Sequence, residues 1–304
     1  MAPKNFFCGR PVAYVRHRSA GCGMMVTEPR FFSSSILPVR EWLLLRRGSF
    51  NKLPLRVRVG YFHHPHLGHS LIDTGYCNVD TLRKLKQGPL LAAYRLLMRP
   101  TTLRDDPLSA GLSLLDLCKQ DIQTVILTHF HADHIGGLRD LPDVQILCSR
   151  KAWETFRNKS ATKNAMTGVF GGLLPDGIEK RLRFFEDFRT APAPNRLEPG
   201  RDIAADGSVL VIDLPGHLDG HVGLCFPDLP TPLLYATDTQ WLIRAITEDR
   251  LPGFPASLVC HDRRAMLSSV AKVRSFFEQG GEIMLCHDPV AHRLDLDIGL
   301  ERAS

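Results

Sequence analysis

The chain lacks long hydrophobic runs, paired cysteine motifs and a serine-hydrolase elbow. No window approaches the roughly 18 uncharged apolar residues that cross a membrane, so we expect no membrane insertion. The eight cysteines are scattered without a C-x-x-C pair, which favours structural thiols in a reducing cytoplasm. The first 27 residues lack the apolar core of a secretory signal peptide, and we expect none. No G-x-S-x-G occurs, which argues against a nucleophilic serine.

Positive charge is concentrated at the N-terminus. Residues 1–58 hold eleven Lys or Arg against two acids, a balance of +9, whereas the remainder of the 304 residues carries −3. We interpret this excess as a solvated basic arm. The composition, 44% hydrophobic and 23% charged, is typical of a globular protein. The rest of the chain has no basic groove of the kind that binds nucleic acid, so we expect no nucleic-acid partner.

The stretch Thr124–Leu138, TVILTHFHADHIGGL, is the most informative in the chain. A short apolar β-branched run predicts a buried strand, and four potential metal ligands follow it within six residues: His129, His131, Asp133 and His134. A lone histidine beside a strand is usually a core residue, but a cluster of this density is not. Imidazole and carboxylate ligands suit zinc, iron or manganese, and the absence of cysteine from the cluster argues against a closed structural zinc site.

The segment HFHADH resembles the H-x-H-x-D-H signature of the metallo-β-lactamase superfamily. The resemblance implies an α+β fold, a single-domain αββα sandwich in which two β-sheets are flanked by helices and a metal site lies at one edge. We expect an irregular arm over residues 1–38, the domain over 39–290 and a short tail over 291–304. Residues 151–206 have weak periodicity and many prolines, which predicts an insertion or lid at the substrate pocket.

Several local patterns predict elements around the motif. Glu41–Leu45 and Leu55–Val59 suit strands, as do the apolar runs at 144–148, 209–214, 233–235 and 282–286, and Ser113–Gln120 suits a helix. A further helix is expected to begin after Asp262, which would cap it, and to end at Gly280-Gly281. A further helical stripe over 80–101, broken at Gly88-Pro89, indicates core or lid packing. The sequence YFHHPHLGHS predicts a hairpin, and we interpret its four histidines as turn and substrate-rim residues rather than ligands: His63, His64, His66 and His69.

The resemblance also implies the remaining ligands. The segment P-G-H-L-D-G-H resembles the superfamily pattern P-G-H-x-x-G-H, which makes His217 a ligand and His221 a supporting residue. Asp238, which ends an apolar strand, corresponds to the carboxylate that bridges two metals, although Thr237 stands where the superfamily usually has glycine. His287 ends the last strand. Asp73, in D-T-G, corresponds to an outer carboxylate that accepts a hydrogen bond from a ligand histidine.

Together these residues form two ligand groups. The resemblance implies that one ion is held by His129, His131 and His217, the other by Asp133, His134 and His287, with Asp238 between them. Such an arrangement fits two divalent ions, with zinc expected and iron or manganese as alternatives, about 3.5–4 Å apart. We expect a metal-bound hydroxide to attack a carbonyl, with Asp133 or a metal-bound water carrying the proton to the leaving oxygen.

The layout from about Val39 to Asp288 resembles the N-acyl homoserine lactonase branch, which implies a lactone or ester substrate. In that branch a tyrosine three residues after the bridging aspartate assists the lactone. Here that position is Trp241, a pocket residue whose indole donates one hydrogen bond but exchanges no proton.

Other hypotheses remain open. A thioesterase of the hydroxyacylglutathione hydrolase type would use the same ligands, and a mononuclear iron persulfide dioxygenase would use fewer of them. A nuclease would need an added domain, for which the chain has no room, and a non-catalytic relative would have lost ligands. A homodimer is also left open.

Overall fold

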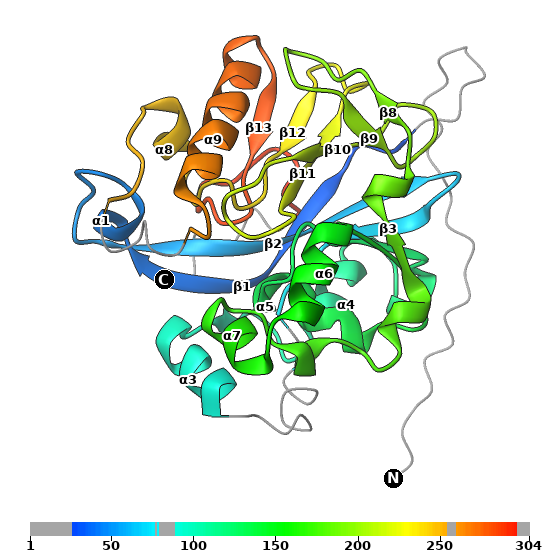
Figure 1. Cartoon of the computed structure of the whole chain (residues 1–304), viewed down its shortest axis with the longest axis horizontal. Helices are drawn as coiled ribbons and strands as arrows, with labels where there is room; N and C mark the ends of the chain where they lie inside the picture. Colours follow the sequence, from blue (N-terminus) through cyan, green and yellow to red (C-terminus); the bar gives the residue numbers. More distant parts are fainter. Residues whose placement is uncertain (1–25, 77, 79–88, 254–259, 297–304) are drawn as a thin grey trace.

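Two β-sheets face each other at the centre of the molecule, with helices on the outer side of each (Figure 1). The computed structural model describes residues 26–76, 78, 89–253 and 260–296. Within them, the first sheet has seven strands in the order β4-β1-β2-β3-β5-β6-β7 and the second has six in the order β13-β12-β11-β10-β9-β8. The predicted αββα sandwich is therefore confirmed.

The first sheet combines a long hairpin with parallel strands. Strands β1 and β2 are antiparallel, and β3, β5, β6 and β7 pair in parallel, which requires helical crossovers between them. Its strands are β1 (Arg30–Arg40), β2 (Lys52–His64), β3 (Gly68–Ile72), β4 (Thr101–Thr102), β5 (Thr124–Ile126), β6 (Gln145–Cys148) and β7 (Leu182–Phe184).

The second sheet is mostly antiparallel, with a parallel pair formed by β12 and β13. Its strands are β8 (Thr190–Ala191), β9 (Gly200–Asp202), β10 (Leu210–Asp213), β11 (Val222–Phe226), β12 (Leu233–Tyr235) and β13 (Glu282–Met284). The strands predicted from the apolar runs at 144–148, 209–214, 233–235 and 282–286 are confirmed to within two residues at each end.

Helices cover both sheets. Those near the first sheet are α1 (Glu41–Leu44), α3 (Pro89–Met98), α4 (Pro107–Ser113), α5 (Ala132–Ile135), α6 (Arg150–Asn158) and α7 (Ala161–Met166); α8 (Ile243–Thr247) and α9 (Arg263–Glu278) lie against the second (Figure 1). Short 3-10 turns are η1 (Lys119–Asp121), η2 (Gly136–Asp140), η3 (Gly171–Leu173), η4 (Ile178–Arg181) and η5 (Phe185–Asp187). None of the helices in the described part of the chain is long and apolar enough to span a bilayer.

Aromatic side chains fill the space between the sheets. The rings of Phe31 and Tyr235 are 4.8 Å apart between centroids, and those of Phe62 and Phe226 are 5.5 Å apart, each pair joining one sheet to the other. All four are fully buried. Burying such a side chain contributes about 1.5–3 kcal/mol, so this layer is a main source of the free energy that holds the sheets together.

Helix α9 forms where the sequence predicted it. The carboxylate of Asp262 accepts a hydrogen bond from the backbone N–H of Ala265 at 3.0 Å, which caps the first turn. Gly280, just past the end, has a φ of 86°, a conformation that glycine adopts without strain. The buried face packs on the second sheet and consists of Met266, Ser269, Val270, Val273 and Phe276.

The N-terminal boundary was predicted wrongly. Residues 30–38, expected as part of an irregular arm, belong to strand β1, which pairs with β2 from Arg30 to Arg40. The polar run at 33–35 disguised the strand, because the hydroxyls of Ser33 and Ser34 are hydrogen-bonded inside the protein. Ser34 Oγ donates to the carbonyl of Val57 at 3.1 Å, and Arg56 Nη1 donates to Ser33 Oγ at 3.2 Å. Residues 1–25 of the expected arm lie outside the described residues.

Two local predictions were also wrong. Glu41–Leu45, expected as a strand, forms the short helix α1, which Glu41 stabilises by accepting a hydrogen bond from the N–H of Ser49 at 2.7 Å. The helix expected over Ser113–Gln120 lies earlier, because α4 starts after Asp106, whose carboxylate caps it through the N–H of Ser109 at 3.1 Å. Residues 79–88 of the helical stripe lie outside the described residues, and 89–98 form α3.

The expected tail is not a tail over residues 291–296. Leu294 and Asp295 are buried, and the Asp295 carboxylate pairs with the buried guanidinium of Arg58 at 2.8 Å. Arg58 also donates to the carbonyls of Leu285 at 3.1 Å and Asp288 at 2.6 Å, so one side chain of β2 holds the loop after β13 and the segment that follows it. Residues 297–304 lie outside the described residues.

The segment 151–206 does more than cover a pocket. It supplies β7 to the edge of the first sheet and β8 and β9 to the edge of the second, so it is part of the sandwich rather than an insertion into it. It also carries α7, which packs against α3.

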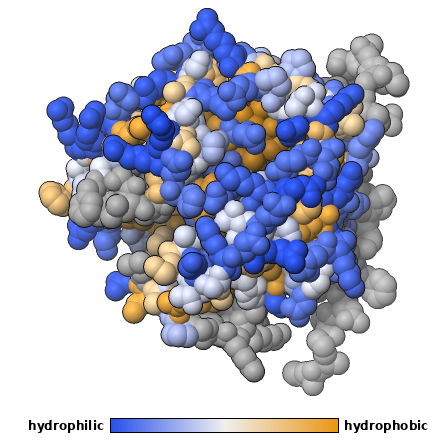
Figure 2. Space-filling view, in the orientation of Figure 1, coloured by the Kyte–Doolittle hydropathy of each residue, from blue (hydrophilic) through white to orange (hydrophobic). Residues whose placement is uncertain are grey.

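Most of the face in view is polar, and apolar residues gather in separate areas, one of them where α3 and α7 lie (Figure 2). There Leu96 and Met166 are 71% and 79% exposed.

Candidate metal centre

The loop after β5 brings the first ligands to the edge of the sandwich. Strand β5 is fully buried and pairs in parallel with β3 and β6, so its carboxyl end opens at the same edge as theirs. His131 precedes the short helix α5 in an extended conformation, and His134 lies within that helix. The tight spacing of the motif thus places side chains from a loop and from a helix turn next to one another.

We call the residues expected to hold one ion a ligand group; the first consists of His129, His131 and His217. The Nδ1 atom of His131 lies 3.0 Å from Nε2 of His129 and 3.0 Å from Nε2 of His217. The Oδ2 atom of Asp238 lies 3.4 Å from Nε2 of His217, and these four residues place one donor atom each within 4.8 Å of the others. The set predicted for one ion is therefore brought together.

The second ligand group consists of Asp133, His134 and His287, and it shares Asp238 with the first. The Asp238 Oδ2 atom lies 3.0 Å from Nε2 of His287 and 3.4 Å from Nε2 of His134, while Asp133 Oδ2 lies 3.5 Å from His287 Nε2. Cys286 Sγ also falls within 4.8 Å of three of these residues. Cys286 was predicted to be a structural thiol, although its position just before His287 could have marked it as a candidate ligand.

Outer hydrogen bonds orient the second group. Asp73, in the left-handed region with a φ of 59°, accepts hydrogen bonds from Nδ1 of His134 at 2.8 Å and from the backbone N–H of Thr128 at 2.8 Å. His287 Nδ1 lies 2.7 Å from the carbonyl of Arg56, which can only accept, so this nitrogen carries the proton. Both rings consequently turn an unprotonated Nε2 toward the centre when they act as ligands.

His221 holds the shared aspartate. Its Nδ1 donates to the carbonyl of Leu214 at 2.6 Å, and its Nε2 accepts from the backbone N–H of Asp238 at 3.2 Å. Thr237 Oγ1 lies 2.6 Å from the same Nε2. Thr237 has a φ of 47°, which explains why glycine is usual at this position, and its hydroxyl provides contacts that glycine would lack.

The donor set fits divalent cations. Two buried atoms, His134 Nε2 and Asp238 Oδ1, have no hydrogen-bond partner within the described residues, and a cation would satisfy both. Burial, helped by the neighbouring imidazoles, holds the pKa of His129 and His217 well below the ordinary value, and burial lowers the pKa of His131 to about 4. These rings are thus neutral, the form that binds metal.

The second group has the opposite electrostatics. Burial acts to lower the pKa of His134, but the carboxylates of Asp238, Asp73 and Asp133 together raise it. The pKa of His287 is also raised, since Asp238 and Asp133 outweigh its burial. A divalent cation would displace these protons on binding, because a ring nitrogen must be deprotonated to coordinate.

The comparison with known families agrees with this geometry. A sequence profile described as "Metallo-beta-lactamase superfamily" matches residues 68–284. The chain belongs to the metallo-beta-lactamase superfamily. The resemblance seen in the sequence is confirmed, and with it the expectation of a metal-dependent hydrolase.

Relatives and solved structures place the chain near lactonases of the superfamily. It is 29% identical over 233 residues to "N-acyl homoserine lactonase AttM" of Azorhizobium caulinodans, covering 75% of this chain and 80% of that protein. It is 30% identical over 142 residues to "Hydroxyacylglutathione hydrolase" of Methylococcus capsulatus, covering 45% of this chain and 42% of that protein.

Two of the similar solved structures are lactonases. An N-acyl homoserine lactone hydrolase with N-hexanoyl-L-homoserine bound at its catalytic metal centre has a TM-score of 0.62 at 16% identity, covering 87% of this chain and 94% of that chain. The dizinc quorum-quenching lactonase AidC has a TM-score of 0.60 at 15% identity, covering 88% and 91%. At these identities the likeness shows the shared fold.

The remaining sequence-predicted residues lie around this superfamily centre or away from it. Trp241 is partly buried against the core of the first sheet, and its role in a pocket stays a prediction. Within the described chain, the four hairpin histidines join neither ligand group; His64, for example, pairs with Asp206 at 2.9 Å. Their hairpin lies at the start of β3, whereas the centre lies beyond its carboxyl end, so the interpretation of these histidines as substrate-rim residues was wrong.

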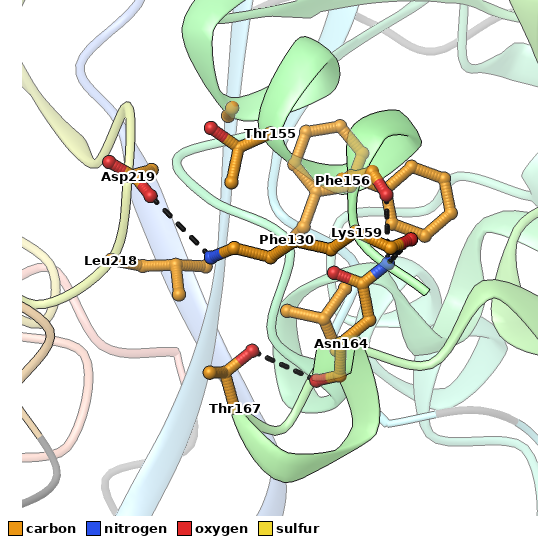
Figure 3. Close-up of a pocket in the computed structure, with 10 residues that line it drawn as sticks. Phe130, Thr155, Phe156, Lys159, Asn164, Thr167, Leu218 and Asp219 are labelled. Carbon is orange, nitrogen blue, oxygen red and sulfur yellow. Dashed lines mark hydrogen bonds and ion pairs between the residues drawn. The ribbon is translucent and has the colours of Figure 1, made fainter. Parts of the chain in front are cut away.

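A recess adjoins the loops that carry the ligand groups (Figure 3). Its volume is about 240 Å³, which includes the open solvent at its entrance. Phe130 and Leu218, each next to a ligand in sequence, line it. The ammonium of Lys159 reaches across toward Asp219, 3.7 Å away, and Lys151 lies 3.3 Å from the same carboxylate. These ion pairs tie the loop after β10 to the region of α6, and so help to place His217.

Proposed function

We propose that the chain is a dinuclear metal-dependent hydrolase that opens lactones of the N-acyl homoserine lactone type. The observation that carries the dinuclear part is the position of Asp238, whose Oδ2 atom lies 3.0–3.8 Å from a ring nitrogen of four histidines in two groups. One carboxylate within reach of two ligand groups suits a bridge between two ions. The similarity to N-acyl homoserine lactonases supports the substrate class.

Each group would hold one ion, with zinc as the expected metal. His129, His131 and His217 offer three neutral imidazoles, and the second group adds the carboxylate of Asp133 to two imidazoles. Two such ions supply Lewis acidity that polarises a carbonyl and makes water nucleophilic near neutral pH.

The chain's own residues then manage protons and the acyl group. Asp133, buried beside His287, is placed to accept a proton from the attacking water and deliver it to the leaving oxygen. We assign the acyl chain to the surface of α3 and α7, where the apolar side chains of Leu96 and Met166 are exposed, because exposed apolar patches often mark ligand-binding surfaces. A small acyl ester or lactone with an apolar tail fits both features.

A metal assay combined with a substrate panel tests the proposal. Purified protein is analysed for metal per chain and assayed on N-hexanoyl homoserine lactone, an alkyl ester and S-acyl glutathione. We expect two equivalents of metal and fastest hydrolysis of the lactone. The variant His66→Ala, on the exposed hairpin, serves as a matched control because it removes an imidazole outside the centre and should keep both properties.

Two results would contradict the proposal. One equivalent of iron with oxygen uptake on a persulfide would indicate the mononuclear dioxygenase. Hydrolysis of S-acyl glutathione in preference to the lactone would indicate a thioesterase, the second candidate, which the similarity to a hydroxyacylglutathione hydrolase supports over less than half of the chain.

A further inference from the structure

Two tyrosines meet beside the ligand groups. Tyr76 follows the Asp73-Thr74-Gly75 turn and is buried, while Tyr94 lies on α3, and their hydroxyl oxygens are 3.4 Å apart. A phenol has one hydrogen to donate and can also accept. If the buried Tyr76 hydroxyl donates to the Tyr94 oxygen, Tyr76 has a hydrogen-bond partner. The hydroxyl hydrogen of Tyr94 then stays free for another acceptor.

Contacts locate Tyr94 at the metal centre. Gly168 lies between Tyr94 and His131, because a Cβ added to it would be 3.3 Å from Cδ2 of His131 and 3.8 Å from Cε2 of Tyr94. The carbonyl of Gly168 accepts a hydrogen bond from the N–H of Ala132. The Tyr94 ring also packs on Phe170, 5.1 Å away between centroids. Gly168 has a φ of 78° and carries no side chain, so nothing from this position stands between the phenol and the ligand.

The charges acting on the phenols point to the same place. The Asp133 carboxylate is the strongest charge acting on each hydroxyl, and after burial it is the main reason that the pKa of both tyrosines is raised. Asp238 and His134 also act on Tyr94. Both phenols therefore stand at the side of the centre where Asp133 lies.

Trp241 leaves a chemical gap that this phenol could fill. An indole offers one N–H and cannot accept, whereas a phenol offers a stronger, reorientable donor. The carboxylates and imidazoles of the centre serve as acceptors or metal ligands. The hydroxyl of Tyr94 adds a neutral O–H donor beside them.

We propose that Tyr94 is a substrate-contacting residue that donates a hydrogen bond to the leaving oxygen of the ester or lactone, and that Tyr76 positions its hydroxyl. This rests on the proposed function. In the hydrolysis, the oxygen of one water bonds to the acyl carbon, and the acyl C–O bond breaks with its electron pair remaining on the leaving oxygen. A hydrogen of the water ends on that oxygen. Tyr94 keeps its own proton and stabilises the negative charge as it builds.

The test compares two esters of one acyl group, an alkyl ester with a poor leaving group and a 4-nitrophenyl ester with a good one. A hydrogen bond to the leaving oxygen matters only where charge on that oxygen is costly. We expect Tyr94→Phe to lower kcat/KM for the alkyl ester and for N-hexanoyl homoserine lactone about 10²-fold, as loss of one oxyanion donor does, with little change for the 4-nitrophenyl ester. Tyr76→Phe should show the same pattern more weakly.

Binding of the ring-opened product gives a readout apart from activity. In N-hexanoyl-L-homoserine the leaving oxygen is a free hydroxyl, so calorimetry should show weaker binding to Tyr94→Phe with unchanged metal content. Tyr61→Phe is the matched control, because its hydroxyl bonds to His69 Nδ1 at 2.7 Å on the hairpin, and it should behave as the unsubstituted chain.

The outcomes separate this inference from the proposed function. If the unsubstituted chain hydrolyses no lactone or ester, the proposed function fails. If it does hydrolyse them and Tyr94→Phe slows both esters equally, or neither, with product binding unchanged, then Tyr94 does not contact the leaving oxygen.

Discussion

The two ligand groups of the metal centre are held in different ways. In the first, His129 is held by the neutral hydroxyl of its neighbour Thr128 at 3.1 Å, and the rings pack on one another, His131 and His217 at 4.7 Å between centroids. In the second, His134 is bound by a carboxylate 61 residues away and His287 by a backbone carbonyl 231 residues away. The first group is held by a hydroxyl and by ring packing, and the second is held by a distant carboxylate and a distant backbone carbonyl.

The largest effect should come from the residue that both groups share. Asp238→Ala removes the carboxylate between them and leaves His287 without its nearest anion, so we expect metal content well below two per chain and activity lowered by more than about 10²-fold. Elemental analysis and lactone hydrolysis measure this. Retention of two ions with full activity would show that the groups do not depend on a common bridge.

A smaller and unequal effect should follow from Asp73→Asn, because this carboxylate bonds to His134 directly and to His129 only through the hydroxyl of Thr128. Loss of such an outer carboxylate costs about 10–100-fold in metal affinity, and we expect it mainly for the ion of the second group in titrations against a chromogenic chelator. Asp206→Asn is the matched control, because it makes the same change beside His64, away from the centre. Equal weakening of both ions would contradict the division into two differently held groups.

The pH dependence of the metal-free protein should differ in sign between the groups. The folded pKa of His131 is about 4, below the ordinary value near 6.5, so its contribution to stability is present above about pH 6.5 and decreases as the pH falls toward 4. For His134, whose folded pKa is raised, stability is present below about pH 6.5 and is lost as the pH rises through the folded value. NMR signals of the imidazoles, recorded after a chelator has removed the metal, check this. His131 should stay neutral down to about pH 4, and His134 should be protonated at neutral pH.

The smallest effect concerns the backbone before Asp238. Thr237→Gly removes the strain of a positive φ and also removes the hydroxyl beside His221, so the free energy of unfolding should change by less than about 1 kcal/mol. Thr237→Ala keeps the strain, loses the hydroxyl and should cost about 1 kcal/mol more. Urea denaturation compares them; a glycine variant less stable than the alanine variant would show that the strain is negligible.

The sequence predicted the centre better than the chain ends, and the reason is locality. The ligands follow short apolar strands, and each motif contains both the strand and the residue at its end, as in Leu233–Asp238. The strand at 30–40 was missed because Ser33 and Ser34 are hydrogen-bonded to residues of β2, more than twenty residues away along the chain. Asp295 was read as part of a tail because its partner, Arg58, lies 237 residues away.

Tyr94 was missed as a functional candidate for a similar reason. Its helical spacing correctly indicates packing, and no local pattern shows that α3 folds over the loop that carries His131. Gly168, which lies between Tyr94 and His131, belongs to a third segment of the chain. Residues that act from a neighbouring helix carry no motif of their own.

The guanidinium of Arg58 has a consequence for a chain that is cut short at its C-terminus. Every member of the first group and Asp238 lie within residues 1–238, whereas His287 enters the centre on a loop that Arg58 grips together with Asp295. A purified chain that ends at Asp288 keeps His287 but loses Asp295, and it should bind the ion of the second group more weakly than the full chain.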